Sequence, residues 1–367
     1  MNRYITLLLL IFSATGCLNR PERRVELDKR VGHAQFDGLG TVTVEKGSAQ
    51  VRRFEPGVLE LMGQAPLFTG TLVLDEPLER LVVTLHNSMP DATLSLLTPT
   101  GDASEVGLMD TQYPTHRRWE LRDLPAGITT FRVEGGRSLT AEPFRFAYLS
   151  DVQEGIGGVQ DIYKVMNLDP DIAFVVGGGD TTHRGRPAQI ERFLEELTQL
   201  RVPMFTTSGN HDVGWGEERT WFAYMGRNSF HFVFRGVHFT FLDSADATLD
   251  PSVYSWLDGW LAEGRDAVHV VTTHIAPIDP VGSRNGSFSS RREAQLLLSK
   301  LASGGVDLTL YVHIHSYYAF ENAGIPAYIS GGGGGPEERL DGIGRHYLTV
   351  DVDPAVGITK VSVVRID

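Results

Sequence analysis

Five short polar segments of this chain each follow an apolar, strand-like run. These segments are Asp151–Gln153, Gly179–Asp180, Gly209–Asp212, Thr273–His274 and His313–His315. Carboxylates, an asparagine amide and imidazoles are hard and borderline ligands that suit a pair of divalent metals. Polar groups at the carboxyl ends of several core strands can converge on one site, because α/β folds place their ligands there. The series therefore predicts an active site that holds two metal ions.

The elements that must position these residues alternate in type from Phe144 onward. The runs before the five polar segments read as buried strands: FRFAYLS, IAFVV, VPMFTT, AVHVVTT and DLTLYV. Helix-like stretches lie between them. In residues 187–200, apolar residues recur at steps of three and four after Pro187, which is typical of an amphipathic helix on a sheet. Strand and helix in alternation predict a layered α/β domain over residues 144–367.

Two stretches of this domain depart from the alternation. Residues 229–242 form two apolar runs around Arg235-Gly236, which predicts a β-hairpin. The runs RHYLTVDVD and ITKVSVVRI predict a final pair of strands. Three further histidines fall inside strand patterns and are expected to be structural: His231, His238 and His269.

Residues 36–143 show short alternating segments broken by turn residues, without a helical period, which predicts an all-β sandwich domain. Two domains are the number expected for 367 residues. The chain carries 33 basic and 46 acidic residues, a formal net charge of −13, which argues against a nucleic-acid binder. The negative net charge does not exclude small phosphorylated substrates, because bound metal ions can dominate the local field.

The N-terminus has the pattern of an export signal. A positive charge precedes the apolar run Ile5–Phe12, which is too short to span a bilayer, and small residues then lead to Cys17. Residues 1–17 therefore resemble a bacterial lipoprotein signal peptide with a lipobox, in which Ala14 stands where leucine is most common. The alternative is a plain signal peptide with an incidental cysteine. Lipidation at Cys17 predicts a membrane-anchored protein on the periplasmic or extracellular side, with residues 18–35 as a charged tether.

The order D-x-Q, G-D, G-N-H-D, H, H-x-H resembles the calcineurin-like metallophosphoesterases, whose pattern is D-x-H, G-D, G-N-H-[DE], H, G-H-x-H. The resemblance covers about Phe144 to the C-terminus. It implies a central β-sandwich flanked by helices, and the preceding β-sandwich domain is an arrangement similar to that of purple acid phosphatases. It also implies two divalent or trivalent metal ions, either Mn, Fe or Zn.

Matching positions imply a role for each residue. In the first half of the site, Asp151, Gln153 and His315 bind the first metal. Asp180 bridges both metals. The second metal takes Asn210, His274 and His313. His211 resembles the family's catalytic histidine, which protonates the leaving oxygen or stabilises the transition state, and Asp212 is expected to orient its imidazole.

Two positions leave the ligand set of the first metal undecided. Gln153 replaces the histidine of D-x-H, and its amide is a weaker, neutral donor. His183 follows Asp180 by three residues, where purple acid phosphatases have a metal-binding tyrosine. His183 is therefore either a further ligand or a residue that supports the ligands. The run Gly331–Gly335 resembles a glycine run of secreted members and is expected to form a flexible wall of the cleft.

The function implied is metal-dependent hydrolysis of a phosphoester by a metal-activated hydroxide. The substrate class is a mono- or diester of a small phosphorylated molecule or nucleotide. A second hypothesis follows from Gln153: a binding or scaffolding lipoprotein that keeps the fold with weakened catalysis. Against it stands His211, which contributes little to stability and much to catalysis.

Overall fold

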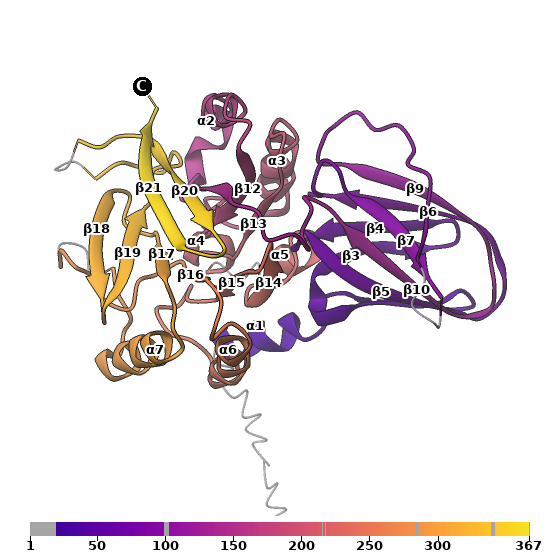
Figure 1. Cartoon of the computed structure of the whole chain (residues 1–367), viewed down its shortest axis with the longest axis horizontal. Coiled ribbons are helices and arrows are strands. Elements are labelled where there is room, and N and C mark those ends of the chain that lie inside the picture. The colour runs from indigo at the N-terminus through magenta and orange to yellow at the C-terminus, as the bar shows by residue number, and fades with distance from the viewer. Residues whose placement is uncertain are drawn as a thin grey trace, which may run out of the picture.

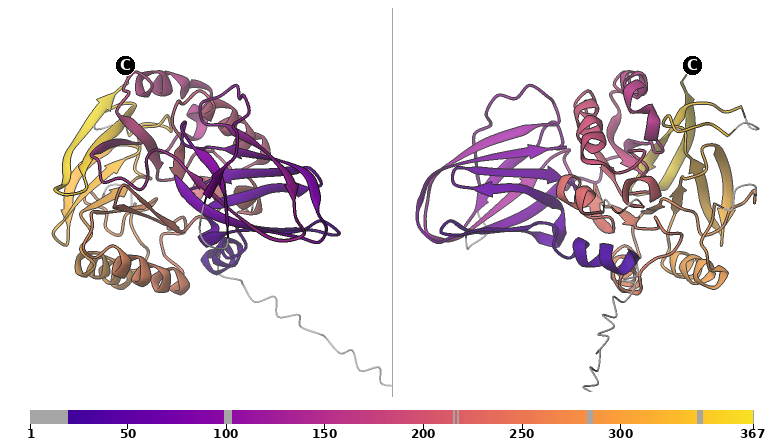
Figure 2. Two further views of the ribbon diagram at one scale, coloured as in Figure 1. Left: turned by 45° about the vertical axis from the view of Figure 1, so that its right-hand side comes forward. Right: turned by 180° about the vertical axis from the view of Figure 1, so that it is seen from behind.

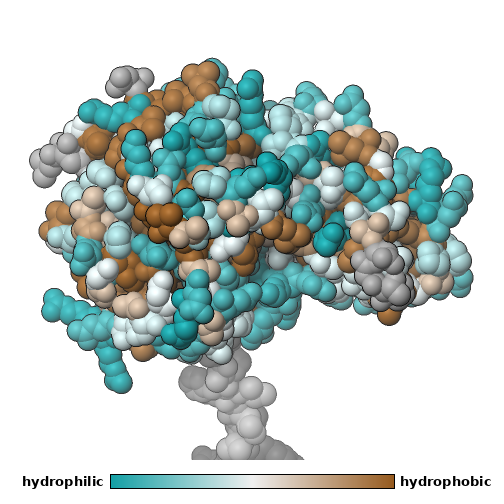
Figure 3. Space-filling view, in the orientation of Figure 1, coloured by the Kyte–Doolittle hydropathy of each residue, from teal (hydrophilic) through white to brown (hydrophobic). Residues whose placement is uncertain are grey.

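The computed structural model describes residues 20–98, 103–214, 216, 218–282, 286–338 and 342–366. They form a β-rich N-terminal domain and a larger domain of strands and helices that lie side by side (Figure 1). Among the described residues, no helix is long and apolar enough to cross a membrane. Cys17 and the predicted leader lie outside the described residues. Polar and apolar side chains are intermixed over the face shown in Figure 3.

Two sheets build the N-terminal domain, as the alternating pattern predicts. One has the order β1-β2-β5-β10-β7-β8 and the other β3-β4-β6-β9. Their bounds are β1 (His33–Phe36), β2 (Gly40–Val44), β3 (Ala49–Glu55), β4 (Val58–Gly63), β5 (Leu67–Leu74), β6 (Leu78–His86), β7 (Thr93–Leu97), β8 (Ala103–Glu105), β9 (Arg117–Leu124) and β10 (Gly127–Glu134), with the short 3-10 helix η1 (Glu45–Gly47). Burial alternates along β5, so one face packs inward. Sheet pairing already begins at His33.

The larger domain is a sandwich of two mixed sheets. The first has the order β13-β12-β11-β20-β21 and the second β14-β15-β16-β17-β19-β18. Their bounds are β11 (Phe144–Tyr148), β12 (Ile172–Gly177), β13 (Met204–Thr206), β14 (Phe230–Phe234), β15 (Val237–Leu242), β16 (His269–Thr273), β17 (Leu308–Tyr311), β18 (Tyr317–Asn322), β19 (Ile325–Ser330), β20 (His346–Asp353) and β21 (Gly357–Arg365). Aromatic rings fill the space between the sheets, and Phe146 and Phe239 meet edge to face at 5.3 Å.

Helices cover both outer faces of this sandwich. α2 (Gln160–Met166) and α3 (Pro187–Leu197) share a buried apolar cluster with the first sheet. α6 (Pro251–Glu263) and α7 (Arg291–Ser303) share another with the second sheet. The remaining helices are short: η2 (Gln153–Gly158), α4 (Asn210–Val213) and α5 (Glu218–Tyr224). The amphipathic helix after Pro187, the β14–β15 hairpin and the final strand pair β20–β21 are confirmed.

The predicted tether over residues 18–35 is wrong for most of its length. Arg20–Asp28 form helix α1, which packs beneath the larger domain beside α5 and α6 (Figures 1 and 2). Val25 of α1 joins the cluster under α6 and α7, and Val31 joins the cluster under α2 and α3. Charge alone made this segment look solvated, whereas two of its charged residues, Arg24 and Asp28, are fully buried.

Candidate metal centre

The five polar segments meet at the carboxyl ends of strands from both sheets. Asp151 follows β11, Asp180 follows β12, and Asn210 opens the helix after β13. His274 follows β16, and His313 follows β17. Direct contacts join the two sheets here: the His313 amide donates to Oδ2 of Asp151 at 3.1 Å, and Nε2 of His274 lies 3.5 Å from Oδ2 of Asp180.

The backbone at this edge is strained where the predicted ligands sit. Asp151, Gln153, Asp180 and His313 have φ values of 57°, 44°, 52° and 70°, in the left-handed region that residues with a Cβ rarely adopt. Each such residue costs about 1–3 kcal/mol and persists where function demands the conformation. The backbone is therefore bent to turn these side chains toward one another.

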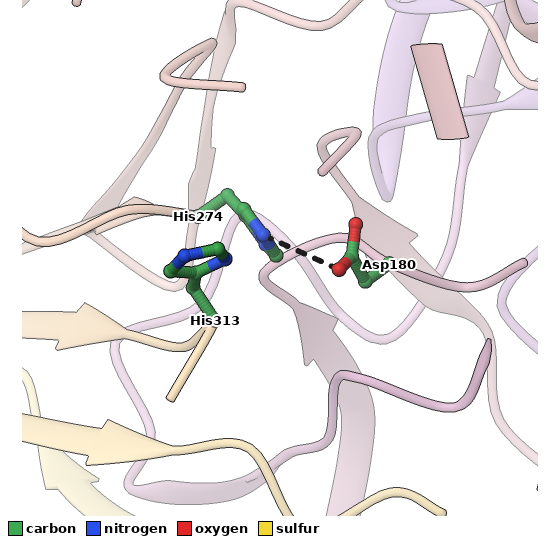
Figure 4. Close-up of side chains that lie close together, drawn as sticks. All are labelled: Asp180, His274 and His313. Carbon is green, nitrogen blue, oxygen red and sulfur yellow. Dashed lines mark ion pairs between the residues drawn. The ribbon is translucent and has the colours of Figure 1, made fainter. Parts of the chain in front are cut away.

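One group of potential ligands comes from three different strand ends. A carboxylate oxygen of Asp180 and one nitrogen each of His274 and His313 lie within 4.8 Å of one another (Figure 4). Nδ1 of His274 is 3.0 Å from the Gly178 carbonyl, so that nitrogen carries the proton. Its Nε2 then faces Oδ1 of Asn210 at 2.9 Å and the Asp180 carboxylate. Lone pairs converge on one point, which is the arrangement a cation stabilises.

The other half repeats this arrangement around His315. Nδ1 of His315 donates to the Pro336 carbonyl at 2.6 Å, and Nε2 lies 3.4 Å from Oδ1 of Asp151. That Oδ1 atom is buried and has no hydrogen-bond partner among the residues that the structure describes. A buried carboxylate oxygen without a donor is costly, and a bound metal ion removes the cost. Both halves of the site therefore fit metal ions in residue type and orientation.

The ionisable groups of the site also favour a bound cation. Burial, together with the neighbouring charges of Asp151 and Asp212, raises the pKa of Asp180 well above its usual value. Burial also acts to raise the pKa of Asp151, but the imidazoles around it, His315 first, outweigh that effect and lower its pKa. Burial lowers the pKa of His274. Closely spaced, buried acidic groups form a site that needs added positive charge.

Gln153 points into the first half of the site. Its Nε2 donates to Oδ2 of Asp180 at 2.8 Å and lies 3.1 Å from Nε2 of His315. The amide nitrogen thus occupies the side facing the predicted first metal. Because the oxygen and nitrogen of an amide exchange places by a 180° rotation, the same side chain can present its carbonyl oxygen to a cation.

His211 is oriented by His183 and not by Asp212, which corrects our expectation. Nδ1 of His211 donates to the main-chain carbonyl of His183 at 2.8 Å, and its amide donates to Oδ1 of Asp180 at 2.8 Å. Asp212 occupies the third position of α4, from which its carboxylate reaches back to the Gly209 amide at 3.0 Å. The same carboxylate accepts hydrogen bonds from the amides and hydroxyls of Thr181 and Thr182. Asp212 therefore holds the GD and GNHD loops together.

The side chain of His183 is engaged elsewhere. Its Nδ1 lies 2.8 Å from Oε1 of Glu154, and its ring centre is 5.3 Å from that of His211. This placement favours the alternative in which His183 supports the site rather than binding the first metal.

The glycine run after β19 is packed against the site and is not a free wall of the cleft. The amides of Gly333 and Gly335 donate to the carbonyls of Ser150 and Asp151 at 2.9 and 2.7 Å. A Cβ on Gly331 would lie 2.8 Å from Oδ2 of Asp151, and one on Gly335 would lie 2.7 Å from Cε1 of His315. Only glycine therefore lets this backbone approach the Asp151 half of the site.

Four groups at the site were missed from the sequence: the carbonyls of Gly178 and Pro336, the Thr181-Thr182 pair, and Glu154. The two carbonyls act through the main chain and leave no trace in residue type. The threonines directly follow Asp180, and hydroxyl residues beside a buried carboxylate were a usable signal.

A sandwich of mixed sheets that gathers buried carboxylates and imidazoles at its strand ends is the architecture of a metal-dependent hydrolase. Residues 144–317 match the family model described as calcineurin-like phosphoesterase. Residues 144–317 are therefore a calcineurin-like metallophosphoesterase domain, and the enzyme class that this domain supports is a phosphoric ester hydrolase. Strands β20 and β21 lie beyond the match and complete the first sheet beside β11.

Solved structures resemble this chain at low sequence identity. A purple acid phosphatase from yellow lupin (Lupinus luteus) seeds has a TM-score of 0.51 and 12% identity, over 81% of this chain and 77% of that one. A dimetal phosphatase from Danio rerio has a TM-score of 0.47 and 13% identity, over 62% of this chain and 100% of that one. An inner-membrane-complex anchor protein of Plasmodium has a TM-score of 0.45 and 16% identity, over 61% of this chain and 89% of that one. No curated protein matches the sequence.

Proposed function

We propose that this protein hydrolyses small phosphomonoesters or phosphodiesters with two metal ions held between Asp151, Asp180 and the site histidines. The observation that carries the proposal is the paired orientation of His274 and His315. Each donates Nδ1–H to a main-chain carbonyl and presents Nε2 to a buried carboxylate. Bound metals would supply Lewis-acid charge and lower the pKa of a bound water toward neutrality.

His211 supplies the acid in this proposal. Its Nδ1–H is held by the His183 carbonyl, so the protonated ring presents Nε2–H to the leaving oxygen. The hydrogen bond from its amide to Asp180 fixes the ring beside the carboxylate predicted to bridge the metals. We expect His211→Ala to lower kcat by about 10²–10⁴-fold, the usual range for a general acid, with metal content unchanged. Near-normal turnover would remove His211 from the mechanism.

Metal content and substrate class are tested on purified protein that lacks residues 1–17. We expect close to two ions per chain after growth with Mn, Fe or Zn, and hydrolysis of a chromogenic phosphoester. One ion or none under all three supplements would contradict the two-metal proposal. Comparing a mono- with a diester across the three metals then identifies the preferred class.

The scaffolding alternative keeps one specific support, the amide contact of Gln153. In that contact the donor faces the site, whereas a metal needs the carbonyl oxygen. Two ions bound with turnover absent on every phosphoester would favour this alternative. Gln153→His restores the family's usual ligand. It should increase metal affinity under both the enzymatic and the scaffolding hypothesis.

Membrane anchoring is part of the same proposal and rests on the lipobox-like residues before Cys17. We expect the full-length protein to fractionate with membranes, and Cys17→Ser to release it. If the serine variant stays with the membrane fraction, the lipidation proposal fails while the enzymatic one is unaffected.

A further inference from the structure

Helix α1 buries an arginine against acidic side chains that follow β15. Arg24 is 0% exposed, and its Nε and Nη2 bind both oxygens of Asp243 at 2.6 and 3.2 Å. Its Nη1 binds Asp246 at 2.7 Å. Burying a guanidinium is costly unless its partners are fixed, so this contact holds α1 in one position.

The same helix contacts the chain at both ends of α5. Before α5, Nη1 of Arg20 donates to the carbonyl of Gly214 at 3.2 Å. Gly214 caps the C-terminus of α4, the helix that carries Asn210 and His211. Arg23 then lies 3.8 Å from Glu218 at the start of α5.

After α5, the buried carboxylate of Asp28 accepts the amides of Asn228 and Ser229 at 2.7 and 3.1 Å. These residues lead directly into β14. α1 therefore brackets the connection from the catalytic helix α4 to the second sheet, and Figure 2 shows it alongside that connection.

A second line of contacts runs from α1 to His274. The Asp243 amide donates to the Ser229 hydroxyl at 3.0 Å, so the two anchoring points of α1 are themselves joined. The next residue, Ser244, accepts the Ile275 amide at 2.8 Å and donates to the Ile275 carbonyl at 3.3 Å. Ile275 directly follows His274. Helix α1 is thus connected to two of the site segments, Gly209–Asp212 and Thr273–His274, through three or fewer contacts each.

We infer that α1 is a positioning element of the active site, which holds the His211 helix through Arg20 and Arg23 and the His274 turn through Arg24. The inference rests on the proposed function, since it assigns α1 a part in that reaction. It makes residues outside the matched phosphoesterase region necessary for full turnover. It also places a positioning element three residues after Cys17, the residue predicted to carry the lipid.

The test compares two full-chain variants that alter exposed cations in α1 or directly after it. Arg20→Ala/Arg23→Ala removes both contacts to the α4–α5 connection. The matched control is Lys29→Ala, whose charge lies 2.6 Å from Glu26 of α1 itself. We expect the double variant to lower kcat about tenfold relative to the control, because a displacement of about 1 Å costs about 10²-fold and loosening costs less. KM should stay within twofold and metal content should not change.

Hydrogen exchange gives a readout that does not depend on turnover. The amides of His211 and Gly214 donate to Oδ1 of Asp180 and the Asn210 carbonyl at 2.8 Å each. Both should exchange faster in the double variant and not in K29A. If the wild type hydrolyses no phosphoester, the proposed function fails, and faster exchange still supports the positioning role. Exchange and kcat that both match K29A would overturn the inference.

Arg24 is tested separately, because its removal leaves the buried Asp243 carboxylate without its cation and takes a partner from the partly exposed Asp246. Arg24→Met/Asp243→Asn removes the central pair together and retains the volume. Slower turnover with two metals bound would support the inference through the His274 line. A folded variant with wild-type kcat would limit the positioning role of α1 to the contacts of Arg20 and Arg23. If the Arg20→Ala/Arg23→Ala variant also matches the control, the inference is wrong.

Discussion

Replacing Gly331 by alanine tests whether the glycine run holds the Asp151 half of the metal centre. A Cβ here lies 2.5 Å from the Ile314 carbonyl oxygen and 2.8 Å from Oδ2 of Asp151. Ordinary contact begins at 3.4 Å, so the groups must separate by about 0.9 and 0.6 Å respectively. Ile314 lies between His313 and His315, so either the glycine run or the H-x-H turn moves.

The cost follows from that displacement. Overpacking of this kind lowers stability by about 1–3 kcal/mol, and a displacement approaching 1 Å in a catalytic group costs about 10²-fold in rate. We therefore expect Gly331→Ala to fold, to retain the metal at Asp180, His274 and His313, and to lose the metal at Asp151. Turnover should fall about 10²-fold.

The assay is metal content per chain by mass spectrometry after gel filtration, with kcat measured on the same sample. Gly158→Ala is the matched control, because it lies in η2 near Asp151 and its Cβ would meet nothing within 4 Å. If G331A keeps two metals and a kcat within twofold of G158A, the packing argument is refuted.

Three further predictions concern stability. Asp212→Asn should destabilise the fold by about 3 kcal/mol in urea unfolding, because either amide orientation sets an NH₂ against main-chain donors that now bind a carboxylate; unchanged stability would contradict this. Burial lowers the pKa of both His231 and His269 to about 3. The unfolded state therefore binds more protons below about pH 6.5, and stability falls as pH drops, by about 2 kcal/mol for each imidazole at pH 5. In the variant His231→Gln/His269→Gln, the Tm measured in thermal melts should depend less steeply on pH between pH 7 and 5. Chelation should lower Tm, and Mn²⁺ at about 100 times its Kd should restore about 2.7 kcal/mol; equal melting with and without metal would argue against a metal centre.

The order of polar segments after apolar runs was enough to predict a layered α/β domain with a site at its strand ends, and the family resemblance added the expectation of a central sandwich. Strand identity was readable because each run is short, apolar and followed by a polar segment, as in IAFVV before Gly179–Asp180. The orientation of His211 was not readable. It depends on α4 beginning at Asn210, which turns Asp212 back toward Gly209 and leaves the ring to a main-chain carbonyl.

α1 escaped prediction for a different reason. Its sequence is rich in both charges, which is the composition of a solvated segment. The partners that bury Arg24 and Asp28 lie about 200 residues away in sequence, at Asp243 and Asn228. The local sequence pattern cannot reveal such pairing, because a buried charged residue differs from an exposed one only in what surrounds it after folding.

The two halves of the metal centre differ in what the chain offers. Around Asp180, two imidazoles and the Asn210 carbonyl oxygen face one point. Around Asp151, the Gln153 amide lies between Asp180 and His315 and donates to the carboxylate that both metals are predicted to share. A cation entering the first half must therefore displace a hydrogen bond of the Gln153 amide, and that bond ends on Oδ2 of Asp180, the same oxygen that lies 3.5 Å from Nε2 of His274. The glycine run packs on the first half, and close glycine packing also holds the second, where a Cβ on Gly209 would lie 2.1 Å from Oδ1 of Asp180 and 2.6 Å from Cε1 of His274.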